Sequence, residues 1–82
     1  MEEINQSPVI TKKEEPKTLS FPMAIQEVIE GKRITRIEWN NNHYGFLNSG
    51  FLSLFRDGKV HQWLVNEGDM LATDWISLPA LN

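Results

Sequence analysis

The sequence has no cysteine among its 82 residues, and this absence removes several kinds of site. Without thiols the chain forms no disulfide, no cysteine-based zinc site and no thiolate nucleophile. It also lacks any apolar run that approaches the roughly 20 residues of a membrane-spanning helix. The first residues carry neither a basic start nor an apolar stretch. We therefore expect a cytoplasmic protein, since absence of cysteine also fits a reducing compartment.

Patterns of the common catalytic sites are missing as well. Ser49 and Ser53 have no Gly-x-Ser-x-Gly setting, and the two histidines, His43 and His61, have no carboxylate at a spacing that would orient them. No glycine-rich phosphate loop is present. Two lone histidines on a hairpin are more often surface groups than metal ligands. We predict no enzyme activity, no metal and no cofactor.

Positive charge is in short supply, with 8 Lys and Arg against 11 Asp and Glu and a net charge of -3. A protein that binds many nucleic-acid phosphates needs clustered Lys and Arg, because binding is driven by counterion release. We therefore expect no nucleic-acid polymer as a partner. A small anionic ligand stays open, because one or two local cations can hold a phosphate whatever the global charge.

Residues 1–19 are predicted to be a disordered tail, and residues 20–82 a small folded domain. The tail is polar and charged, with few sizeable apolar groups, so it cannot bury enough surface to offset its ordering entropy. Its charged block, residues 12–15, is better explained as a solvated linker than as a recruitment peptide. The remaining core of about 60 residues is marginal. Self-association is the remaining route to stability.

The folded part begins with a predicted helix. Ser20 is a good N-cap, Pro22 suits the first turn, and Gly31 suits a left-handed C-terminal cap. One apolar stripe at helical spacing should pack this helix on a sheet. The stripe consists of Phe21, Ala24, Ile25, Val28 and Ile29.

Short strands should follow, at residues 34–39, 43–47, 51–55, 60–65 and 75–78. Asparagines at 40–42, Asn-Ser-Gly at 48–50 and Asp57-Gly58 supply the turns, and the Asp-Gly hairpin is the strongest local signal. Asn66 can cap a short helix over residues 67–73, with Asp69 completing a capping box. The expected fold is α+β, an N-terminal helix packed on a small antiparallel sheet with a short C-terminal helix.

Aromatic residues gather around these turns. Trp39 adjoins three asparagines and Trp63 precedes the short helix. Indoles stack on a nucleobase for about 1–3 kcal/mol, and Asn and Asp bind base edges and ribose hydroxyls. These are the parts of a nucleoside pocket, although core filling is the commoner role of tryptophan in a small domain. Trp75, on an apolar closing strand, is assigned to the core, and Asp69 and Asp74 alone would be a helix cap and a turn residue.

Two segments together resemble a known family. They read Phe21-(x)9-Gly31-Lys32-(x)2-Thr35-Arg36-(x)2-Trp39-Asn40 and Trp63-Leu64-(x)4-Asp69-Met70-Leu71-Ala72-(x)1-Asp74-Trp75. Over residues 20–78 the chain is similar to the phage Thoeris anti-defence family of the second type. The second segment is the more specific. Glu38 departs from the family's usual Gly, and residues 48–51 lack the long insertion of many members, so no second ligand site is carried over.

The resemblance implies a homotetrameric sponge in the host bacterial cytoplasm. Such a protein binds a nucleotide signal, glycocyclic ADP-ribose or a related cyclic nucleotide, without cleaving it, so that the downstream immune effector is never activated. It implies that Trp39 and Asn40 face the base, that Asp69 and Asp74 are polar anchors, and that Trp63 lines the wall. The rival hypothesis is a protein-interaction module in which Trp39, Tyr44 and Trp63 form one aromatic patch.

Overall fold

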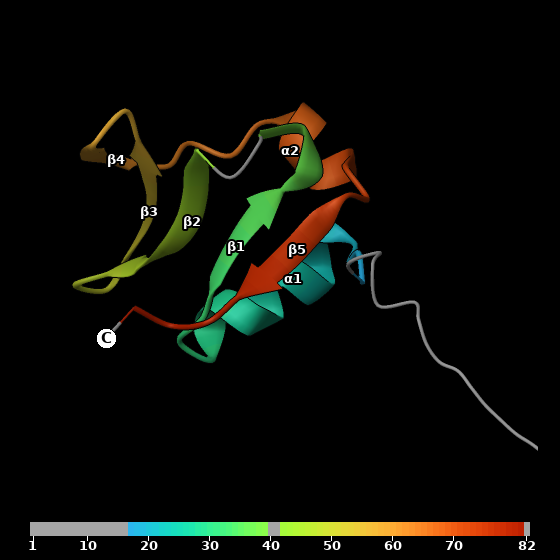
Figure 1. Ribbon diagram of the computed structural model, residues 1–82, viewed down its shortest axis with the longest axis horizontal. Coiled ribbons are helices and arrows are strands. Elements are labelled where there is room, and N and C mark those ends of the chain that lie inside the picture. The colour runs from blue at the N-terminus through green and yellow to red at the C-terminus, as the bar shows by residue number, and fades with distance from the viewer. Residues whose placement is uncertain (1–16, 40–41, 82) are drawn as a thin grey trace, which may run out of the picture.

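The computed structural model describes residues 17–39 and 42–81, which form a helix, an antiparallel sheet and a second, short helix. The α+β fold predicted from the sequence is therefore confirmed (Figure 1). The elements are α1 (Phe21–Ile29), β1 (Arg33–Arg36), the 3-10 turn η2 (Ile37–Trp39), β2 (His43–Asn48), β3 (Phe51–Arg56), β4 (Lys59–Gln62), α2 (Glu67–Leu71) and β5 (Trp75–Leu78).

The strands lie in the order β4-β3-β2-β1-β5, so the last strand of the chain returns to lie beside the first (Figure 1). β5 pairs with β1 and sets Trp75 opposite Arg36. β2 and β3 form a hairpin that sets His43 opposite Arg56. The return of β5 places residues 33–36 and 75–78 side by side although they are far apart in sequence.

The two hairpin turns have the predicted residues and a tight geometry. Ser49 and Gly50 have φ of 53° and 86°, and Asp57 and Gly58 have φ of 55° and 77°. Left-handed backbone at both central residues is the type I′ turn, whose twist matches that of the flanking strands. The Asp-Gly hairpin predicted from the sequence is confirmed.

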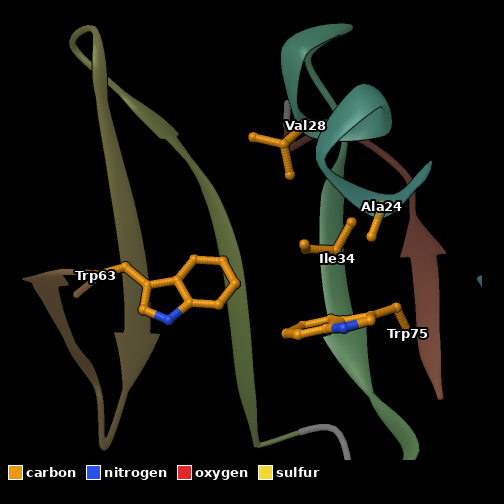
Figure 2. Packing of buried hydrophobic residues seen from close by; sticks show 5 residues of the cluster. All are labelled: Ala24, Val28, Ile34, Trp63 and Trp75. Atoms are coloured by element: carbon orange, nitrogen blue, oxygen red, sulfur yellow. The ribbon is translucent and has the colours of Figure 1, made fainter. Parts of the chain in front are cut away.

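The core lies between α1 and one face of the sheet. Ala24 and Val28 of the helix pack against Ile34 of β1 and Trp75 of β5, and all four are 0–1% exposed (Figure 2). The assignment of Trp75 to the core is confirmed. Ile29, predicted to join the apolar stripe, is 63% exposed. It lies about 100° around the helix from Val28, at the edge of the stripe, so it turns away from the sheet.

Three elements end earlier than the sequence predicts. The strand expected over 34–39 stops at Arg36, because the backbone N–H groups of Ile37 and Glu38 bond to Asp74 (3.1 and 3.2 Å) and draw the chain into η2. β4 stops at Gln62 instead of residue 65, since the chain leaves the sheet there for α2. α2 stops at Leu71 instead of residue 73, because the next residue is extended.

The predicted tail falls mostly on residues 1–16, which lie outside the described residues. Of its described part, Leu19 forms a β-bridge with Trp75, with 2.8 Å from the Leu19 nitrogen to the Trp75 oxygen, and packs on the core. Neither helix within residues 17–39 and 42–81 has the length and apolarity to cross a membrane.

Gly45, in the middle of β2, leaves the space in which the Trp63 ring lies. A Cβ atom at this position would overlap the Trp63 indole, with its Cε3 atom only 2.8 Å away. The ring is 6% exposed and belongs to the same buried cluster as Trp75 (Figure 2). The glycine therefore decides how closely Trp63 approaches the sheet.

Gly45→Ala should lower the free energy of unfolding by about 1–3 kcal/mol, because the added methyl overpacks the core against Trp63. Urea denaturation measures the loss. Trp63→Leu supplies the control, since the shorter side chain makes room for the methyl. The cost of Gly45→Ala should shrink in that background, and an equal cost in both backgrounds would contradict the steric explanation.

Candidate functional site

A pocket of about 440 Å³ opens where β2, β3 and β4 meet η2 and the segment that connects β4 to α2. This segment, residues 63–66, crosses the upper edge of the sheet in Figure 1. The volume falls within the range of ~300–1,000 Å³ of small-molecule sites. The apolar part of the lining consists of Trp39, Leu54, Trp63 and Leu64. The polar part consists of His43, Arg56, His61, Gln62, Asn66 and Asp69.

Trp39 is held in the pocket wall by the turn η2 and by other aromatic rings. The Asp74 carboxylate accepts hydrogen bonds from Nε of Arg36 (2.7 Å) and from the backbone N–H of Glu38 (3.2 Å), which fixes the turn. The Trp39 ring then packs edge-on against Trp75 at 5.2 Å and against Trp63 at 6.1 Å between ring centroids. Trp39 is half-buried, so part of its ring remains open to a ligand.

Asp69 holds both buried indoles. Its Oδ2 accepts hydrogen bonds from Nε1 of Trp63 (3.4 Å) and from the backbone N–H of Asn66 (3.3 Å), and its carbonyl oxygen accepts one from Nε1 of Trp75 (3.1 Å). Oδ1 of Asn66 accepts the Asp69 N–H at 2.9 Å. The capping box predicted at this helix is therefore confirmed.

The Asp74 carboxylate is held in its ionised form. Burial by itself would raise its pKa, but the hydrogen bonds from Arg36 and from the Glu38 N–H, together with the charge of Arg36, outweigh burial and hold the pKa below its usual value. The same guanidinium stands over the Trp75 ring, 5.7 Å from its centroid. Arg36 and Asp74 thus tie η2 to the start of β5.

The structure brings three of the predicted ligand residues together and separates one. Trp39, Trp63 and Asp69 line the pocket. Asp74 is not in the lining and instead anchors the turn that carries Trp39. Asn40 lies outside the described residues. Ligand binding by these residues stays a prediction.

Three further lining residues are absent from the sequence-based prediction. His43, Arg56 and His61 come from β2, β3 and β4 and lie on the face of the sheet that holds Trp63. Nδ1 of His43 is buried and has no hydrogen-bond partner among the described residues. The only sequence signal for this group is the alternation of side chains along two hairpins, which needs the register between strands.

A comparison with known protein families tests the resemblance to the Thoeris anti-defence family. The model of the Tad2-like family, the Thoeris anti-defense 2-like domain, matches residues 19–78. The chain belongs to this family. The suspected relationship is confirmed, and membership supports an anti-defence role. A comparison with curated proteins found no match.

In this Tad2-like domain the two segments that carry the resemblance meet in space. Thr35 and Arg36 of the first segment pair with Ile76 and Trp75 across β1 and β5. Asp74 joins them through its ion pair with Arg36 at 2.7 Å. Part of the family pattern is thus a scaffold that positions Trp39.

Asp74→Asn should lower the free energy of unfolding by about 1–3 kcal/mol near neutral pH, because it removes the charge from a partly buried ion pair. The carboxylate has a lowered pKa in the folded state, so its contribution is present above the unfolded-state pKa of about 3.9 and is lost as pH falls through the folded-state pKa. Urea denaturation at about pH 6 and pH 3 compares variant with wild type. The difference in the free energy of unfolding between wild type and Asp74→Asn should be smaller at pH of about 3. An equal difference at both pH values would refute the stabilising role of the Asp74 carboxylate.

Proposed function

We propose that the protein binds and sequesters a nucleotide-derived immune signal, glycocyclic ADP-ribose or a related cyclic nucleotide, and leaves it uncleaved. The observation that carries the proposal is the pocket in which Trp39 and Trp63 meet the Asp69 carboxylate. The half-buried Trp39 ring can stack on a base while Trp63 lines the wall, and a carboxylate accepts hydrogen bonds from ribose hydroxyls or an exocyclic amine. The family match over residues 19–78 agrees with this proposal.

A sequestering protein needs affinity rather than turnover. Nanomolar binding corresponds to about 12 kcal/mol, and rings that are fixed in advance lose little entropy when the ligand arrives. Trp63 is fixed by its bond to Asp69 and by the space above Gly45. Trp39 is fixed by two other indoles. The pocket wall is therefore ordered before binding.

The bonding of Asp69 supports capture without cleavage. One oxygen of its carboxylate already accepts two N–H groups, from Trp63 and from Asn66. A general base needs a lone pair directed at the proton it removes. This bonding favours a role for Asp69 as a fixed polar anchor over a role as a base.

The alternative function, a protein-interaction module with one aromatic patch, has less support from the positions of the aromatic rings. Trp63 is 6% exposed and offers little area to another protein. Tyr44 precedes Gly45 on β2, so it points to the sheet face away from Trp63. Trp39 and Trp63 line one pocket and Tyr44 lies on the opposite face, so the three rings do not form one patch.

We also propose that the binding unit is a homotetramer assembled through the sheet face opposite α1. Tyr44 and Phe46 flank Gly45 and point to this face, and Tyr44 stacks on Phe55 at 4.9 Å. Phe51, on the strand of Phe55 and four residues before it, is 68% exposed. A core as small as this one gains stability when a second copy covers such rings.

Capture of the signal tests the proposed function directly. Purified protein incubated with glycocyclic ADP-ribose, washed and denatured should release the intact ligand in amounts comparable to the binding sites. Trp39→Ala should weaken binding by about tenfold or more, because base stacking is worth about 1–3 kcal/mol. Ile29→Ala is the control, since Ile29 is exposed on α1 and outside the lining.

Absence of uptake together with an unchanged melting temperature would contradict capture of this signal. Release of a cleaved product would contradict the non-catalytic part of the proposal. Unchanged affinity in Trp39→Ala would remove the assigned base site and leave the fold as it is.

Native mass spectrometry tests the assembly. The wild-type protein should have four times the mass of one chain, and Phe51→Glu should shift it to smaller species, because a charge placed among the rings opposes their burial. Ile29→Glu, an equal change on the exposed side of α1, should keep the tetramer. A wild-type monomer at micromolar concentration would contradict the proposal.

A further inference from the structure

The pocket has basic side chains in its lining besides the tryptophans. Arg56 ends β3, and His43 stands opposite it on β2. His61 of β4 stands opposite Leu54, two residues before Arg56. Directly opposed residues have Cβ atoms about 5 Å apart and diagonal neighbours about 7–8 Å apart. Three side chains able to donate hydrogen bonds therefore converge from adjacent strands on one wall of the pocket.

This basic side adjoins the aromatic side. The His43 ring contacts Trp39 edge-on, with 5.9 Å between ring centroids. Trp63 follows His61 by two residues and belongs to the same lining. One pocket is thus lined by two indoles and the Asp69 carboxylate and also by a guanidinium and two imidazoles.

The charge on the basic side is not neutralised locally. No ion pair joins Arg56 to another residue in the described part of the chain. The acidic residue of the lining, Asp69, already accepts the N–H groups of Trp63 and Asn66. Across the β3–β4 pair Arg56 faces Lys59, a second cation. An anion is the chemical complement of this wall, even though the whole chain carries a net charge of -3.

The geometry points to Arg56, assisted by His61 and His43, as the binding site for the diphosphate of the captured nucleotide. A guanidinium presents paired N–H donors that match two phosphate oxygens. With the diphosphate on this wall, the base lies toward Trp39 and Trp63 and the ribose toward Asp69. This inference rests on the proposed function, and it adds the residues that recognise the charged part of the signal.

A consequence of this arrangement is selectivity for phosphorylated ligands. Adenosine presents the same base and one ribose to the tryptophan end but leaves the basic wall without an anion. We therefore expect adenosine to bind far more weakly than glycocyclic ADP-ribose, and the affinity for the charged ligand to fall with added salt.

Isothermal titration calorimetry with glycocyclic ADP-ribose, adenosine and inorganic pyrophosphate tests the assignment. Arg56→Gln should weaken binding of glycocyclic ADP-ribose by about 10- to 100-fold, reduce its salt dependence and leave adenosine unaffected. His61→Leu should weaken it several-fold. Lys17→Gln, which removes one positive charge outside the pocket lining, should bind like wild type. Arg56 is exposed, so the variant should melt at the wild-type temperature.

The outcomes separate this inference from the proposed function. If wild type binds glycocyclic ADP-ribose and Arg56→Gln binds it equally well, the diphosphate site is overturned and the proposed function stands. If wild type ignores the nucleotide but binds pyrophosphate in an Arg56-dependent manner, the anion site stands and the proposed function falls. If wild type binds neither ligand, both are overturned.

Discussion

The hydrogen bonds of Asp69 are the interaction on which the rest of the structure depends. Asp69 lies in the first turn of α2, completes its capping box and accepts the N–H groups of two buried tryptophans. A buried indole N–H without a partner would cost about 1–3 kcal/mol, so the first turn of α2 stabilises the positions of both rings. Since Trp63 and Asp69 also line the pocket, the same bonds shape the core and the candidate site.

Features set by neighbouring residues were predictable from the sequence. The helix, the Asp-Gly hairpin and the capping box at Asn66 each depend on residues within a few positions of one another. The end of β1 depends on Asp74, which binds Arg36 across 38 positions of sequence. The basic wall of the pocket depends on the register of two hairpins. Such contacts leave no local pattern, so Trp39 was expected on a strand and Arg56 was not singled out.

The aspartates of the second family segment have different parts in the structure. Asp69 lies at the pocket and in the cap, whereas Asp74 acts at a distance by fixing η2. The family resemblance implied the same role, a polar anchor near the ligand, for both. The distinction matters for interpreting variants, because loss of a side chain that positions Trp39 changes the pocket without removing any group that contacts a ligand. Stability and binding measured together separate the two roles.

The edge strands of the sheet affect how readily copies of this protein aggregate at high concentration. β4 is a four-residue edge strand that begins with a lysine, and β5 is bridged at Trp75 by Leu19. Short, charged or covered edges discourage the strand-by-strand addition that leads to fibrils. Under the proposed function, which binds a messenger without turnover, the protein must accumulate at least to the level of that messenger. Blunted edges suit such abundance, because they keep crowded copies from polymerising.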